Sequence, residues 1–191
     1  NAEGTRTPSG GRTSAYAGHI DPGNGVGNRG SFSYQHGPGL TPQQADTAQL
    51  TRLSRLVPAD EAAVRRAGLD PNNATLATAY FDLYNQSPTA AARFLNQVGD
   101  LRATGITQQS VTDLRFHSFV DKNTGQRFTY TGSDGRTHRA GGGFATIARN
   151  NLGRAPTEAE IQRVIRADQT RRENAMAAAM SSQGIGAGET Q

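Results

Sequence analysis

The residues of this sequence that are best suited to chemistry lie in its glycine-rich N-terminal segment. Glu3 stands in a Glu-Gly-Thr triplet, and Asp21 follows in a His-Ile-Asp-Pro-Gly-Asn stretch. Two carboxyl groups cleave a glycosidic bond when one holds a proton to donate and the other stays ionised. The residue types therefore allow Glu3 as a general acid and Asp21 as the second carboxylate. On pattern alone, a solvated glutamate is the plainer interpretation of Glu3.

Aromatic and histidine side chains of the same segment are candidates for contact with a sugar. Residues 31–34 alternate as in a short strand, which would place Phe32 and Tyr34 on one face. Together with Tyr16 and His19, these side chains could line a substrate site, although docking of the rings onto a helical core is the more ordinary use of them. For His19 and His36 we favour a hydrogen-bonded structural role, because no second pair stands at metal-ligand spacing.

A metal site is a further possibility at the turn sequence that begins at Asp21. Asp21, Asn24 and Asn28 offer oxygen ligands of the kind that calcium accepts. Their spacing does not match an EF-hand loop, and Asp-Pro-Gly-Asn is an ordinary turn sequence. We therefore predict a turn, no metal site and no cofactor, with calcium at Asp21 and Asn24 as the open alternative.

Composition and charge exclude several classes of partner. The net charge is +4, and Lys122 is the single lysine among 20 basic residues, which alternate with 16 acids along the chain. A nucleic-acid-binding protein would cluster these charges and interleave aromatic residues, so nucleic acid is not expected, whereas an acidic polymer such as a cell wall is compatible. No apolar run reaches the length of about 18 residues that a membrane-spanning helix needs.

The pattern of start and stop signals predicts three parts of the chain. Residues 1–40 form a glycine-rich N-terminal arm that contains the candidate site, residues 41–183 form a helical domain, and residues 184–191 are a disordered tail. Caps followed by apolar residues at helical spacing predict about six helices, and a hairpin is expected near residues 127–139. The fold class is mainly α, with one small β-hairpin and a long irregular arm. The expected helix starts are Thr41-Pro42, Asp60, Asn72 or Asn73, Ser87-Pro88, Thr107 and Thr157.

Several segments resemble a group of little-characterised bacterial proteins, many of them cyanobacterial. The similar segments are AEGTR, YAGHIDPGNG and GSFSYQHG near the start, PQQAD and QLTRL after them, and LRFHSFVD and ADQTRREN downstream. The Glu-Gly-Thr start is in turn similar to lysozyme-like muramidases, in which the glutamate closes a helix and acts as general acid. This resemblance implies a lysozyme-like α+β fold, Glu3 as the acid and Asp21 as the second carboxylate.

The resemblance implies a glycoside hydrolase that acts on peptidoglycan or a related polysaccharide, at the cell surface or outside the cell. The alternative is a non-catalytic secreted or surface structural protein that kept the fold and assembles with itself. Only two residues precede Glu3 in this sequence, which has no initiator methionine, so we interpret the chain as a processed product or a fragment. An amphipathic helix before Asn1 would favour the enzyme, and a mature terminus at Asn1 the structural protein.

The composition of the arm also predicts self-association. Its apolar anchors are few, namely Tyr16, Ile20, Val26, Phe32 and Tyr34. Ordering such a segment costs more chain entropy than burial of these side chains within one chain easily offsets. We therefore expect the arm to contact a second copy of the chain, making the protein a homo-oligomer.

Overall fold

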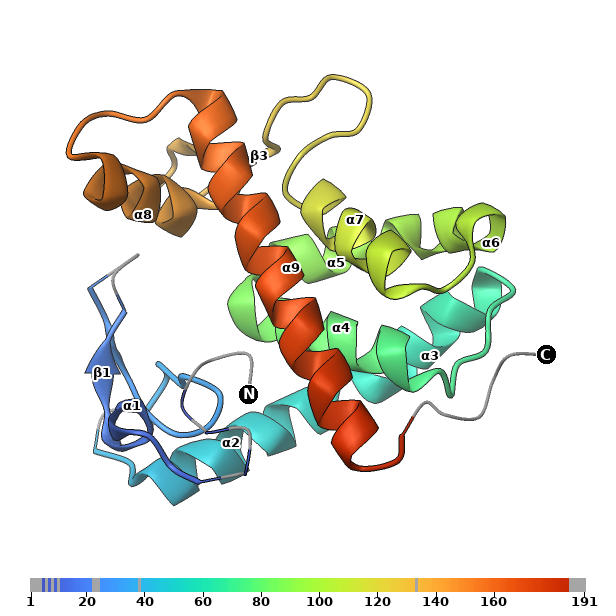
Figure 1. Ribbon diagram of the computed structural model, residues 1–191, viewed down its shortest axis with the longest axis horizontal. Coiled ribbons are helices and arrows are strands. Elements are labelled where there is room, and N and C mark those ends of the chain that lie inside the picture. Colours follow the sequence, from blue (N-terminus) through green and yellow to red (C-terminus); the bar gives the residue numbers. More distant parts are fainter. Residues whose placement is uncertain are drawn as a thin grey trace.

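The computed structural model describes Thr5, Thr7, Ser9 and residues 11–21, 25–37, 39–132 and 134–185. Helices dominate this part of the chain, and the longest, α9, crosses the molecule and contacts α4, α7 and α8 (Figure 1). The helices are α1 (Ser14–Ala17), α2 (Pro42–Ser54), α3 (Val57–Arg66), α4 (Ala74–Gln86), α5 (Pro88–Gln97), the 3₁₀ helix η1 (Val98–Asp100), α6 (Leu101–Thr104), α7 (Gln108–His117), α8 (Gly142–Leu152) and α9 (Glu158–Ser182).

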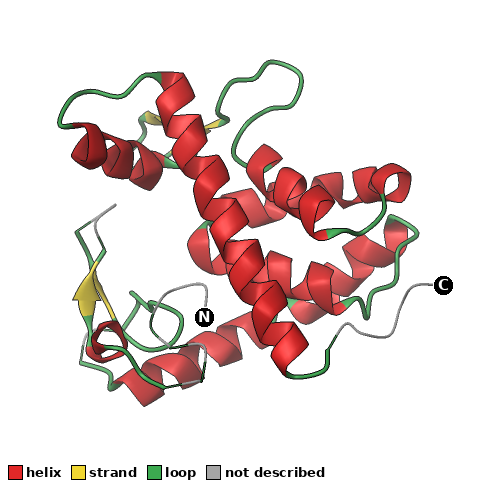
Figure 2. Cartoon of the chain, viewed as in Figure 1, coloured by secondary structure: helices red, strands yellow, loops and turns green. Residues whose placement is uncertain are grey.

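Strands contribute two small antiparallel sheets to the described residues. In the arm, β1 (His19–Ile20) pairs with β2 (Gly27–Asn28), and farther along β3 (Thr129–Thr131) pairs with β4 (Thr137–Arg139). Figure 2 shows how little of the molecule these strands occupy beside the helices. The mainly α fold and the hairpin within residues 127–139 are therefore confirmed. The hairpin inside the arm was not predicted.

Capping side chains set most helix starts where the sequence predicts them. Thr41 accepts a hydrogen bond from the Gln44 amide while Gln44 Oε1 accepts one from the Thr41 amide, and Thr157 and Glu160 form the same reciprocal pair before α9. Such pairs satisfy amide groups that the first helical turn leaves without a partner. Asn73, rather than Asn72, caps α4.

Two local predictions are wrong. The helix expected from Asp60 begins earlier, at Val57, because Pro58 fits the first turn of a helix, where its missing amide hydrogen is not needed. Residues 31–33 form a turn rather than a strand, with Ser33 at a φ of 52°, and Tyr34 makes a single bridge to Arg29. The predicted tail lies outside the described residues from position 186 onward.

The core lies where α4, α5, α7 and α9 meet. Leu83, Phe94, Val111 and Ile165 contribute one buried side chain from each of these helices. At the start of α8, the ring of Phe144 meets the ring of Phe119 edge-on, with centroids 5.5 Å apart. The core therefore also fixes the helix that begins at the glycines of residues 141–143.

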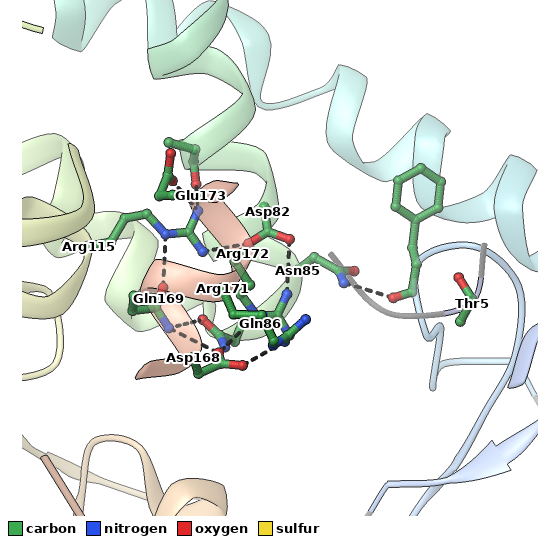
Figure 3. A network of polar contacts seen from close by, with 12 residues as sticks. Thr5, Asp82, Asn85, Gln86, Arg115, Asp168, Gln169, Arg171, Arg172 and Glu173 are labelled. Carbon is green, nitrogen blue, oxygen red and sulfur yellow. Dashed lines mark hydrogen bonds and ion pairs between the residues drawn. The ribbon is translucent and has the colours of Figure 1, made fainter. Parts of the chain in front are cut away.

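A charged group stands in the middle of this apolar core. The Arg115 side chain on α7 is 0 % exposed, and its Nε donates to Gln169 Oε1 of α9 at 2.9 Å. Its Nη1 donates to the Ala79 carbonyl of α4 at 2.8 Å, and its Nη2 donates to Asp82 Oδ2 at 2.5 Å. Figure 3 shows the guanidinium between its partners on α4 and α9. One side chain thus joins three helices.

Glu173 also belongs to this cluster, but one of its carboxylate oxygens lacks a hydrogen-bond donor among the described residues. Its Oε1 lies 3.3 Å from Arg115 Nη1, within ion-pair distance, yet it accepts no hydrogen bond from the described residues. Burial raises the pKa of Glu173 to about 7, with the charge of Arg115 opposing the rise and that of Asp82 adding to it. The folded protein therefore retains a proton on Glu173 that an unfolded chain releases at lower pH.

Replacing Glu173 with Gln should flatten the pH dependence of stability between about pH 4.5 and about pH 7. The raised pKa makes the contribution of Glu173 complete below about pH 4.5 and lost as the pH rises to about 7. The shift corresponds to on the order of 3 kcal/mol in the free energy of unfolding. Urea unfolding of both proteins across this range measures the difference.

Asp60→Asn is the matched control for this measurement. Burial, with the charge of Glu61, raises the pKa of Asp60 to about 6 from 3.8, so its contribution is lost over a lower pH range. In Asp60→Asn, the free energy of unfolding should depend less on pH below about pH 6 than in the wild type. It should still fall between about pH 6 and about pH 7, because Glu173 is intact. A Glu173→Gln curve parallel to that of the wild type contradicts the assignment.

Candidate functional site

A cleft of about 750 Å³ lies between the arm and the helical domain. The arm forms one wall, α2 and the junction of α4 and α5 form the next, and the start of α8 and the middle of α9 line the remainder. Side chains and backbone from segments more than 100 residues apart in sequence meet here. The cleft therefore contains several of the residues that the sequence predicts for a site.

Polar contacts hold the arm against the helices. Asp46 of α2 accepts from the Ser31 amide at 2.5 Å and from the Ser31 hydroxyl at 2.8 Å. The Asn85 side chain on α4 donates to the Phe32 carbonyl at 2.8 Å. Thr5, which is fully buried, donates to the Ser31 carbonyl at 2.8 Å. The turn at residues 30–33 is thus the point at which the arm is attached.

Gly30 makes this close attachment possible. Its φ is +76°, in the left-handed region that glycine adopts without strain. A Cβ at this position would lie 2.5 Å from Asp46 Oδ1 and 2.9 Å from the Pro42 carbonyl oxygen. Any side chain here would force the arm away from α2.

Asp21 lines the cleft, as its predicted role requires. Its amide donates to the Val26 carbonyl at 2.9 Å and its carbonyl accepts from Gly25 at 2.8 Å, which makes the chain reverse between β1 and β2. The Gln35 side chain donates to Asp21 Oδ2 at 3.1 Å. The arm therefore holds the Asp21 backbone through two bonds and its carboxylate through Gln35. Asn24 of the alternative calcium site lies outside the described residues.

His19 also lines the cleft, half-buried at the start of β1. Its Nδ1 lies 3.1 Å from the Ala15 carbonyl oxygen, which can only accept a hydrogen bond. This contact requires a hydrogen on Nδ1, so in the neutral ring Nε2 is an acceptor. His19 thus combines a structural hydrogen bond with a place at the cleft.

The remaining predicted residues separate into three groups. Tyr34 lines the cleft, and its ring meets His36 edge-on with centroids 5.5 Å apart. Tyr16 is only 4 % exposed and packs under the guanidinium of Arg12, and neither Tyr16 nor Phe32 is among the cleft-lining residues. Glu3 lies outside the described residues, so its place relative to the cleft is a prediction.

Two cleft arginines carry charge that no described carboxylate balances. The Arg52 guanidinium of α2 lies 5.1 Å from the ring centre of Tyr84, and that of Arg93 on α5 lies 4.3 Å from the ring centre of Phe128. Within the described chain, neither forms an ion pair, and burial lowers the pKa of Arg93. The resulting positive potential favours an anionic ligand.

The α9 wall carries charge that is already paired. Asp168 accepts from Gln86 at 2.7 Å, from Arg172 Nε at 2.9 Å and from Arg171 at 2.7 Å (Figure 3). Burial opposes ionisation of Asp168, but the charges of Arg172 and Arg171 outweigh it, so the pKa of Asp168 is lowered. Arg172 in turn donates to Asp82 at 3.0 Å, which links this wall to the buried Arg115 cluster.

Sequence reasoning missed most of the helical half of the cleft. The residues it did not single out include Gln49, Arg52, Tyr84, Asn85, Arg93 and Asp168. One signal was available, because Asp168, Arg171 and Arg172 stand at spacings of three and four residues within ADQTRREN and so share a helix face. Nothing in the sequence indicated that the arm would meet this face.

Metal-ligand clusters and membrane-spanning helices are absent from the described part of the chain. Among its residues, no three histidine or acidic side chains converge as a metal site requires, and no helix combines the length and apolarity needed to cross a membrane. No family model, curated protein or solved structure matches the chain. The cleft geometry is therefore the basis for a functional proposal.

Gly30→Ala should detach the turn of the arm from α2. The new Cβ would collide with Asp46 and Pro42, whereas Gly39→Ala meets nothing within 4 Å at a similar φ of +86°. Both variants carry the left-handed strain of roughly 1–2 kcal/mol, so their difference isolates the collision. Hydrogen exchange should accelerate at residues 28–34 in Gly30→Ala only. Equal exchange in the two variants would show that the attachment does not depend on this close approach.

Proposed function

We propose that the chain binds a strand of peptidoglycan or a related acidic polysaccharide in the cleft and cleaves it by acid-assisted glycosidic hydrolysis. The observation that carries this proposal is the cleft itself, which is lined by Asp21 from the arm and by Arg52, Arg93 and Tyr84 from the helices. Carboxylates, aromatic rings and arginine are suited, respectively, to glycoside chemistry, sugar stacking and carboxylate binding. Such a substrate would place the protein outside the cell or at its surface.

The proposal gives each predicted residue a role. Glu3, which lies outside the described residues, is the proton donor on the strength of its Glu-Gly-Thr context, and Asp21 is the second carboxylate. Tyr34 and His19 contact the sugar from the arm, while Arg52 and Arg93 attract the acidic groups of the polymer. The position of Asp21 on the cleft wall suits a carboxylate that stabilises positive charge at the reacting carbon or activates water.

Glu3→Gln and Asp21→Asn should each abolish cleavage and leave the fold intact. Glutamine cannot donate the proton, so the rate should fall roughly 100-fold or more. Release of reducing ends from purified peptidoglycan measures the rate, and circular dichroism checks the fold. Glu61→Gln is the control, because Glu61 pairs with Arg65 on the exposed side of α3 and does not line the cleft. Full activity in Glu3→Gln, or none in the wild type, overturns the catalytic proposal.

A second candidate function is a non-catalytic surface protein that assembles through its arm. Contacts within one chain already bury Tyr16 and Thr5, so ordering of the described arm does not by itself require a partner. However, Ile20 is 67 % exposed and Val26 is 41 % exposed beside the arm hairpin. Apolar side chains left open on a small strand pair favour contact with another copy of the chain.

The double variant Ile20→Ser, Val26→Ser should reduce self-association. The arm stays attached in this variant, because its anchors are Ser31, Phe32 and Thr5, so the change acts on the exposed patch alone. Light scattering over a range of concentrations measures the mass. Leu152→Ser, which alters a side chain of α8 that is as exposed as Val26, is the control. A monomeric wild type at high concentration would remove the structural alternative.

A further inference from the structure

Two buried amide oxygens at the cleft lack a hydrogen-bond donor. Gln49 of α2 is 1 % exposed and Asn28 of β2 is 4 % exposed, and both line the cleft. Among the described residues, no donor reaches Gln49 Oε1 or Asn28 Oδ1. Buried polar atoms in native proteins nearly always have a partner, so an unpaired acceptor at a cleft indicates a ligand or an ordered water.

The orientation of the Gln49 amide follows from its neighbours. The Phe32 carbonyl oxygen can only accept, so the Asn85 group 2.8 Å from it must be the amide nitrogen. Asn85 Oδ1 then faces Gln49, and it must receive the Gln49 nitrogen, which lies 2.8 Å away. Oxygen is therefore the Gln49 atom left without a partner. The Phe32 carbonyl thus fixes the Asn85 amide, and Asn85 in turn fixes the Gln49 amide so that its oxygen needs a hydrogen-bond donor.

Arg52 brings a positive charge to the same wall of the cleft as this acceptor. Gln49 and Arg52 are three residues apart on α2 and both line the cleft, so they share one face of the helix. Arg52 lies on the ring of Tyr84 and forms no ion pair with a described carboxylate. A ligand that satisfies both residues carries an N–H or O–H donor close to an anionic group, and in the proposed polysaccharide this group is a carboxylate.

We infer that Gln49 and Arg52 form a subsite for an acidic amino sugar, with Gln49 accepting from its amide or hydroxyl group and Arg52 binding its carboxylate. Asn28 supplies a second acceptor from the facing arm. The inference rests on the proposed function and adds to it the sugar unit that the α2 wall recognises. A neutral amino sugar would satisfy Gln49 but not Arg52.

Binding of two glycans of equal length distinguishes the contribution of Gln49 from that of Arg52. One is a tetramer of N-acetylglucosamine, which is neutral, and the other is a tetrasaccharide in which N-acetylmuramic acid alternates with it. We expect Gln49→Met to weaken binding of both about tenfold, because each offers the donor. Arg52→Gln should weaken only the acidic tetrasaccharide, by a similar factor. Isothermal titration calorimetry gives the dissociation constants.

Asn85→Leu is the control for an indirect effect through the arm. It removes the contacts of Asn85 with Gln49 and with Phe32 but keeps the Gln49 amide, whose oxygen can still accept from a ligand. Gln49→Met should therefore weaken binding more than Asn85→Leu does. Equal losses would mean that Gln49 acts only by positioning the arm, and this result overturns the subsite. A thermal melt confirms that each variant is folded.

The outcomes also distinguish the subsite from the function on which it rests. If the wild type binds neither tetrasaccharide, both the proposed function and the subsite fail. If it binds both and Gln49→Met leaves the dissociation constants unchanged, the subsite alone is wrong. If Arg52→Gln weakens the two glycans equally, Arg52 does not recognise the carboxylate, and the acidic specificity is overturned.

Discussion

The rest of the structure depends on the buried guanidinium of Arg115. A charge in an apolar core is strongly unfavourable unless it is paired and hydrogen-bonded, and here α4 and α9 supply every partner that the described residues provide. The three helices must therefore keep one relative position for the charge to be tolerated. Asp82 extends the arrangement to Arg172, and Arg172 extends it to Asp168 at the cleft. The wall of the candidate site is in this way continuous with the core.

The arm is attached to this framework by polar groups rather than by apolar burial. Its glycine content leaves few apolar side chains to offset the entropy of ordering. Asp46 and Asn85 instead bind the turn at residues 30–33, and Gly30 lets the two backbones approach. Asn85 directly precedes Gln86, which donates to Asp168, so the arm and the α9 wall are held by adjacent residues of α4. This coupling brings Asp21 to the same cleft as residues near position 170.

The sequence predicted those features that depend on neighbours along the chain. Helix starts at Thr41, Ser87 and Thr157 followed from local capping. Contacts between distant segments could not be predicted in this way. Tyr16 looked available to a sugar but is buried under Arg12, and Gln49 looked like an ordinary helix residue. Its importance arises only from Asn85 and Phe32, whose positions are set by the fold.

In the proposed function, the cleft between the arm and the helices receives the glycan. An NMR titration of the labelled protein with soluble peptidoglycan fragments tests it directly, because each amide reports its own surroundings. We predict shifts that map to Asp21, Gln35, Thr89 and Gly142 on the walls of the cleft. Shifts confined to the second cavity, of about 350 Å³ beside Asp100 and Lys122, would contradict the account, as would none at all.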